Sequence, residues 1–235
     1  MLGLDARRTR DALSLTFCQL GMPGEIKYSA GTVIRAVREA FPAQTALVAA
    51  RLALSGAVTG FERPLEGEAG FYRLYAAGHY DPARLFADLG KRFHIADLSF
   101  KPWPSCRGTH AFIELAGGLV AEHRLDWREI DAIEVEVDEV HEMLVAPLAR
   151  KQAPAVAIDA KFSIPFTLAL SLVRGRVTLD DFEPDSLTAP EILALAARVT
   201  PVPAEPGAWP RGLGGGGRVG LRLGLVGHDA GHPLA

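Results

Sequence analysis

Apolar residues near the start of the chain recur at intervals of three and four, the spacing of a helix with one buried face. Leu13, Phe17 and Leu20 follow this spacing. Asp5 precedes the pattern as a suitable N-cap, and Gly21 follows it as a suitable helix end. The pattern therefore predicts a helix from Asp5 to about Leu20 with its apolar side buried.

The next periodic segments predict two further helices. In residues 33–40, Arg35 and Arg38 lie three positions apart and share one side, opposite an apolar side. These arginines are either ligand contacts or surface charges. Pro42 suits a first helical turn and Gly56 suits a helix end, so a second helix is predicted between them. Its larger residues are expected in the core: Leu47, Ala50, Leu52 and Leu54.

Beyond residue 80 the pattern predicts both helices and strands. Asp81 and Pro82 suit the start of a short helix, and the stretch Thr188-Ala-Pro-Glu191 matches a capping box. Apolar and acidic residues alternate between Ile133 and Asp138, as in a strand with one solvated face. The predicted elements are helices at 81–93, 105–123, 163–173 and 188–199, and strands at 95–100, 133–138 and 218–226.

Reactive side chains are concentrated in the ten residues KPWPSCRGTH, positions 101–110. Two prolines restrict the backbone there, so we expect a sharp turn followed by a helix with Ser105 as its N-cap. The N-terminus of a helix attracts anions, and Lys101, Arg107 and His110 would add positive charge. The turn is therefore either an anion site, most simply for a carboxylate, or a junction whose Lys and Arg are only solvated.

Composition and charge restrict the class of partner and the cellular compartment that we expect for this protein. The 235 residues suffice for one large domain or two small ones, and 49% of them are hydrophobic. A formal net charge of −3 argues against nucleic acid or an anionic membrane as the main partner, so a small molecule is expected. Two distant cysteines, Cys18 and Cys106, favour a reducing cytoplasm. No apolar run is long enough for a membrane span, and the first residues do not form a signal peptide.

Two further groups of residues could suggest a metal site. Glu134, Glu136 and Asp138 alternate regularly, which is more typical of a solvated strand face. His228 and His232 are four residues apart, but glycine and proline around them argue against a helix. Both groups are therefore interpreted without a metal.

Several segments together resemble the MmgE/PrpD family, which includes 2-methylcitrate dehydratase, cis-aconitate decarboxylase and iminodisuccinate epimerase. They occur in family order from Leu2 to Val199: LGLDARRTRDAL, AFPAQTALVAARLALSGAVTGFE, LEGEAGF, KPWPSCRGTH, DWREIDAIEVEV, AKFSIPFTLALSLVRGRVTLDDF and PEILALAARV. The chain departs from the family pattern where Arg35 and Arg38 stand at the two basic positions of a KRLHxGFAA-like motif. It departs again at Phe166, where many members have tyrosine.

The resemblance implies an α+β fold, with a partial all-α helical domain, a smaller α+β domain and an active-site cleft between them. The implied domains are residues 1–94, residues 95–200 and a Gly/Pro-rich segment at 201–235. Lys101 and His110 match catalytic positions. The residues that match substrate-binding positions are Arg35, Arg38, Ser105, Cys106 and Arg107. Neither a metal nor an organic cofactor is implied.

The resemblance also implies a lyase, specifically a dehydratase of a hydroxy di- or tricarboxylate such as the 2-methylcitrate of propionate metabolism. The alternatives are an epimerase of an amino- or imino-dicarboxylate, or a non-catalytic carboxylate-binding remnant or subunit. Family members extend further at the N-terminus, where a catalytic aspartate and histidine are implied. We therefore expect this chain alone to bind substrate without turning it over, and to form a homodimer or pair with a complementary N-terminal chain.

Overall fold

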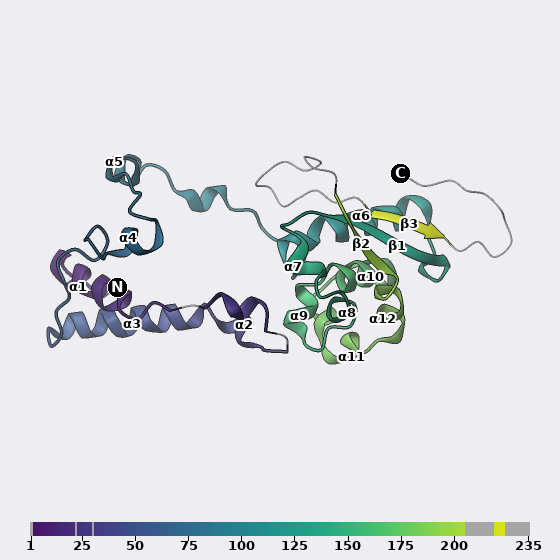
Figure 1. Ribbon diagram of the computed structural model, residues 1–235, viewed down its shortest axis with the longest axis horizontal. Coiled ribbons are helices and arrows are strands. Elements are labelled where there is room, and N and C mark those ends of the chain that lie inside the picture. Colours follow the sequence, from purple (N-terminus) through teal and green to yellow (C-terminus); the bar gives the residue numbers. More distant parts are fainter. Residues whose placement is uncertain (1, 22, 30, 205–218, 224–235) are drawn as a thin grey trace. The chain divides into compact units, whose positions relative to one another are not determined.

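The protein consists of two compact units in a computed structural model that describes residues 2–21, 23–29, 31–204 and 219–223 (Figure 1). The helical unit comprises Met1–Ser29 and Val33–Ser99, and the α+β unit comprises Ala30–Thr32 and Phe100–Ala235. Helices and a small sheet together confirm the predicted α+β class. Among the residues described, no helix is long and apolar enough to cross a membrane.

Short helices make up the described part of the helical unit. Asp5 caps the first, since its carboxylate accepts a hydrogen bond from the Arg8 N–H at 2.7 Å. Asp81 caps the fifth in the same way, and Gly56 ends the third in the left-handed conformation with φ of 72°. The elements are α1 (Ala6–Phe17), η1 (Gly24–Lys27), α2 (Ile34–Val37), α3 (Ala40–Ser55), α4 (Phe71–Tyr75), α5 (Pro82–Phe86) and η2 (His94–Asp97).

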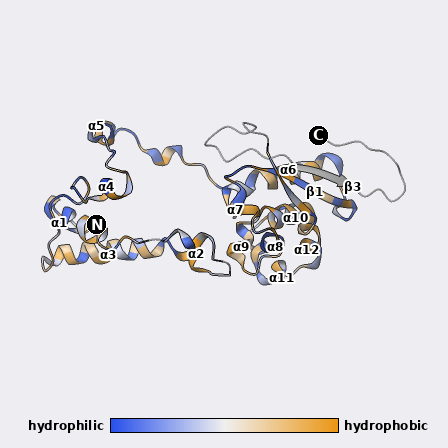
Figure 2. Ribbon diagram, viewed as in Figure 1, coloured by the Kyte–Doolittle hydropathy of each residue, from blue (hydrophilic) through white to orange (hydrophobic). Residues whose placement is uncertain are grey.

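Small and polar residues, rather than the large apolar ones, are buried where α1 packs against α3. Ala49 and Ala53 are the buried residues of α3, and Asp11 and Ser14 are those of α1. The expectation that the large apolar residues of these helices are core is therefore wrong within this unit. Hydrophobic residues recur along α3 (Figure 2), and several are exposed: Leu13 by 45%, Leu47 by 64%, and Leu52 and Leu54 by 37% each.

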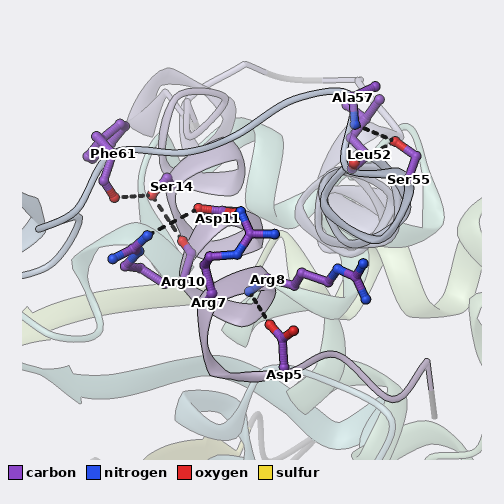
Figure 3. Close-up of polar contacts among 10 residues, drawn as sticks. All are labelled: Asp5, Arg7, Arg8, Arg10, Asp11, Ser14, Leu52, Ser55, Ala57 and Phe61. Carbon is purple, nitrogen blue, oxygen red and sulfur yellow. Dashed lines mark hydrogen bonds and ion pairs between the residues drawn. The ribbon is translucent and has the colours of Figure 1, made fainter.

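A close backbone approach explains the polar buried face of α1. The Ser14 hydroxyl donates to the Phe61 carbonyl at 2.9 Å (Figure 3). A Cβ on Gly60 would lie 2.5 Å from the Ser14 Cβ, so a side chain at position 60 would prevent this approach. Arg7 and Arg10 lie at ion-pair distance, 3.9 and 3.7 Å, from the buried carboxylate of Asp11.

The strand predicted at residues 95–100 is wrong. This segment overlaps the 3-10 helix η2, which ends at Asp97, and Phe100 is fully exposed. Asp97 forms an ion pair with Arg92 at 3.0 Å, and its carboxylate lies 3.6 Å from the Nδ1 of His94. Such contacts between near neighbours favour a turn, whereas a strand requires a hydrogen-bonding partner segment.

The α+β unit is built around strand β1 (Ile130–Val137), which is central in a three-stranded sheet of order β2-β1-β3. β2 (Val199–Pro203) pairs parallel to it and β3 (Val219–Leu223) pairs antiparallel. Ile133 and Val135 are fully buried and Glu134 is exposed, which confirms the predicted alternation. The observed β3 lies within the strand predicted at 218–226, whose other residues are outside the described part.

Helices of the α+β unit surround α10 (Ile164–Arg174), in which nine consecutive residues, 164–172, are buried. The Ser163 hydroxyl accepts from the Phe166 N–H at 3.0 Å, and Gly175 ends the helix with φ of 65°. The other elements are η3 (Arg107–Thr109), α6 (His110–His123), η4 (Trp127–Glu129), α7 (Glu142–Val145), α8 (Leu148–Gln152), α9 (Ala157–Lys161), η5 (Asp180–Phe182), α11 (Pro184–Leu187) and α12 (Pro190–Ala196).

The helix predicted near residue 190 is present as α12, but the capping box is wrong. The Thr188 hydroxyl donates backwards to the Pro184 carbonyl at 3.1 Å, and Ala189 occupies the N-cap position. The helix ends at Ala196, so Val199, its predicted end, begins β2 instead. In the predicted C-terminal segment, His228, His232 and the glycines at 214–217 lie outside the described residues.

Candidate functional site

The predicted reactive turn is a compact backbone feature of the α+β unit. The Ser105 N–H donates to the Trp103 carbonyl at 2.9 Å, and the Cys106 N–H donates to the Lys161 carbonyl of α9 at 2.8 Å. The ammonium of Lys101 donates to the Ser105 carbonyl at 3.1 Å. The last of these bonds holds the ammonium of Lys101 beside Ser105, within the turn.

Ser105 is not the helix N-cap that the sequence suggested. The 3-10 turn η3 (Arg107–Thr109) intervenes, and α6 begins only at His110. The Ser105 hydroxyl is buried and lies 2.7 Å from the Thr109 hydroxyl, which also donates to the Cys106 carbonyl at 2.8 Å. Ser105 therefore stabilises the turn, and substrate binding by this residue stays a prediction.

His110 lies at the start of α6 with its ring edge-on to Trp103, at a centroid distance of 5.3 Å. Burial lowers the pKa of His110 below its ordinary value of 6.5, and the charges of Lys101 and Arg107 act in the same direction. The backbones of Ser105 and Trp103 act against this shift. The lowered pKa favours the neutral imidazole, and the Nε2 of His110 is buried with no hydrogen-bond partner among the residues described.

Arg107 and Cys106 complete the predicted group. Arg107 is exposed, and within the described ranges its side chain forms no ion pair or hydrogen bond with the protein. Cys106 is a free, half-buried thiol that packs against the core. Lys101, Ser105, Cys106, Arg107 and His110 thus lie within ten residues, with the two cations exposed and the imidazole half-buried.

A buried histidine, paired with a partly exposed aspartate, packs against this turn, and the sequence analysis did not identify the two residues as a pair. His141 is 1% exposed, and its Nδ1 lies 2.6 Å from the Asp138 carboxylate. Burial alone would raise the pKa of Asp138, but the hydrogen bond and charge of His141 lower it below its ordinary value. The His141 ring is edge-on to Phe112 of α6 and lies against Gly108.

The space beside Gly108 is filled by these core side chains. A Cβ at position 108 would lie 2.6 Å from the Leu144 Cδ1 and 3.5 Å from the His141 Cδ2. Glycine is therefore required for the turn to approach α7, which carries Leu144. A histidine three residues after an aspartate, at a strand end, was the signal in the sequence for the Asp138–His141 pair.

Arg35 and Arg38, the other predicted binding residues, belong to the helical unit. Arg35 lies on α2 and Arg38 follows this helix directly. The Nε of Arg38 donates to the Glu39 carboxylate at 2.7 Å, and the Arg38 side chain is 31% exposed. Their joint action with the Lys101–His110 turn stays a prediction.

Two comparisons with known proteins relate this chain to one family. Residues 103–206 match the family model described as the MmgE/PrpD C-terminal domain. The chain is also 25% identical over 212 residues to the "Cis-aconitate decarboxylase-like protein oryM" of Aspergillus oryzae (strain ATCC 42149 / RIB 40). These two matches support a relationship to the MmgE/PrpD family.

The alignment with the Aspergillus protein includes most of this chain but a smaller part of the relative. It covers 85% of the chain and 43% of the relative. The chain therefore spans less than half the length of the curated relative that it matches.

Proposed function

We propose that the Lys101–His110 turn binds a carboxylate group of a hydroxy di- or tricarboxylate and serves a lyase that dehydrates this substrate. The observation that carries the proposal is the placement of two exposed cations beside a half-buried imidazole within one turn. The match of residues 103–206 to the MmgE/PrpD C-terminal domain, and the similarity to a cis-aconitate decarboxylase-like protein, support the same reaction class.

The chemistry of dehydration explains why these groups belong together. Removal of a proton α to a carboxylate places negative charge on the carboxylate oxygens, and departure of hydroxide requires a proton. Arg107 would hold the carboxylate through two parallel N–H donors and stabilise the developing charge. Lys101 would add a second positive charge, and His110 would carry a proton at Nε2.

Decarboxylation is a second candidate reaction, because the Aspergillus relative is named as cis-aconitate decarboxylase-like. The same cations would stabilise the charge that remains when carbon dioxide leaves. The two reactions differ in substrate: dehydration starts from a hydroxy acid such as citrate or 2-methylcitrate, whereas decarboxylation starts from an unsaturated acid such as cis-aconitate.

Calorimetric titration of the chain with a matched series of acids tests the proposal. The series consists of citrate, 2-methylcitrate, cis-aconitate and acetate. We expect each multivalent acid to bind at least about tenfold more tightly than acetate, since charged hydrogen bonds contribute about 1.5 to 3 kcal/mol each. A folded sample that binds none of the three multivalent acids would refute the proposal.

The titration also compares the two reaction types. A preference for the hydroxy acids over cis-aconitate supports dehydration, and the reverse preference supports decarboxylation. Formation of the unsaturated product, followed by its ultraviolet absorbance, and release of carbon dioxide distinguish the two reactions directly.

A further inference from the structure

A polar cavity of about 450 Å³ lies within the helical unit, between the loop before α4 and the turn after it. The volume falls in the range of small-molecule sites in proteins. The proposed lyase function assigns no role to any residue of its lining. The lining residues that carry the argument are Glu66, Glu68, Tyr72, Arg73, Gly78 and Tyr80.

Two stacked tyrosines form one wall of the cavity. The rings of Tyr72, on α4, and Tyr80 lie 4.5 Å apart between centroids, with their planes inclined by 7°. The Gly78 N–H donates to the Tyr72 carbonyl at 2.8 Å and so fixes the turn that brings the two rings together. Tyr80 is nevertheless 41% exposed, so its ring offers apolar surface to a ligand.

Glu68 and Arg73 give the lining two opposite charges. Within the described ranges, neither side chain forms an ion pair or a hydrogen bond, although both line the same cavity. Glu66, by contrast, is paired with Arg63 at 3.3 Å. A ligand that carries one negative and one positive group would pair with both Glu68 and Arg73. A ligand with a single charge would pair with one of them and be repelled by the other.

We infer that this cavity binds a free aromatic α-amino acid. Its carboxylate contacts Arg73 through parallel N–H donors, and its ammonium donates to Glu68. Its ring packs against the exposed surface of Tyr80. The inference goes beyond the proposed lyase function and does not depend on the Lys101–His110 turn.

Titration of the chain, Met1–Ala235, with four probes tests each part of this ligand. L-Phenylalanine has both charges and the ring, 2-phenylethylamine lacks the carboxylate, 3-phenylpropanoate lacks the ammonium, and alanine lacks the ring. We expect phenylalanine to bind about threefold or more tightly than either singly charged probe, because solvent screens the exposed ion pairs. It should bind about tenfold or more tightly than alanine, because the ring buries apolar surface.

NMR of the backbone amides measures these affinities and locates the site. Gly67 and Gly78 both line the cavity, so their amide signals should shift as phenylalanine is added. Phenylalanine that binds no more tightly than both singly charged probes overturns the inference. Binding that leaves both glycine signals unmoved overturns it as well. These comparisons use the unaltered chain, so they decide the case even if a variant does not fold.

Variants assign each charge to its part of the ligand. Arg73→Gln should reduce phenylalanine affinity to about that of 2-phenylethylamine and should not weaken 2-phenylethylamine. Glu68→Gln should reduce phenylalanine affinity to about that of 3-phenylpropanoate and should not weaken 3-phenylpropanoate. Arg51→Gln and Glu62→Gln, exposed changes outside the lining, should alter neither. Unchanged phenylalanine affinity in folded Arg73→Gln and Glu68→Gln variants overturns the inference.

Failure of this inference is distinguishable from failure of the proposed lyase function. Citrate binding at the reactive turn should depend on Arg107 and be unaffected by Arg73→Gln. Phenylalanine binding in the cavity should depend on Arg73 and be unaffected by Arg107→Gln.

Discussion

The Nδ1 of His141 lies 2.6 Å from the Asp138 carboxylate, in the core directly against the turn that carries Arg107. The aspartate stands just past the end of β1 and the histidine just before α7, so the pair joins the sheet to the helix that contacts Gly108. A buried polar group that is paired as His141 is here fixes one arrangement of the elements around it. The reactive turn is therefore positioned by residues that do not belong to it.

Loss of the Asp138–His141 hydrogen bond should lower stability. For Asp138→Asn we expect a decrease in the free energy of unfolding of about 1 to 3 kcal/mol at pH 7. Urea unfolding followed by circular dichroism measures the change. Asp131→Asn, an exposed substitution on β1, serves as the control and should change stability by less than about 0.5 kcal/mol. Equal effects of the two substitutions would contradict a specific role for the pair.

Two glycine substitutions near α6 should have opposite effects. In Gly108→Ala the new Cβ meets Leu144 at 2.6 Å, so we expect lower stability and weaker citrate binding. In Gly118→Ala nothing lies within 4 Å, and the helix interior should gain about 0.5 to 1 kcal/mol. Adding Leu144→Ala to Gly108→Ala should recover part of the lost citrate affinity; no recovery would argue against the clash.

The pKa of His110 should respond to its charged neighbours. NMR titration of the imidazole should give a value below 6.5, because burial and two nearby cations disfavour the protonated form. Arg107→Gln and Lys101→Gln should each raise this pKa, whereas Arg176→Gln, an exposed change outside the turn, should not. A His110 pKa above 6.5 in the unaltered chain would contradict the neutral imidazole on which the proton-carrier role depends.

Acid stability should depend on Asp181. Burial alone would raise the pKa of Asp181, but hydrogen bonds from Thr178 and Arg174 lower it below 3.8. A lowered carboxylate pKa stabilises the fold above pH 3.8, and this contribution is lost as the pH falls through the lower folded value. Asp181→Asn should cost about 2 to 3 kcal/mol at pH 7 and reduce the pH dependence of unfolding below pH 4. Asp185→Asn, which is exposed, is the control, and an identical pH profile for both variants would refute this role.

Features that depend only on residues close together in the sequence were predicted correctly. Asp5 and Asp81 cap helices as expected, Gly56 and Gly175 end them, and the alternation around Ile133 forms a strand. These features follow from backbone geometry and from the period of the side chains. The composition of the reactive turn was likewise visible, because its residues are contiguous.

Features that depend on contacts between residues far apart in the sequence were not predicted. The segment 95–100 is apolar enough for a strand, but near-neighbour ion pairs to Asp97 favour a turn. The buried side of α1 follows from the approach of Gly60, which lies 46 residues after Ser14. The role of His141 depends on Gly108, a contact across 33 positions that periodicity cannot reveal.

Citrate titration of two arginine variants tests the central claim, that the Lys101–His110 turn binds carboxylate, most directly. Arg107→Gln removes the exposed guanidinium of the turn, and Arg176→Gln removes an exposed guanidinium elsewhere in the same unit. Calorimetry should show citrate affinity about tenfold or more weaker for Arg107→Gln and unchanged for Arg176→Gln. Equal citrate affinities for the unaltered chain and a folded Arg107→Gln variant would contradict the claim.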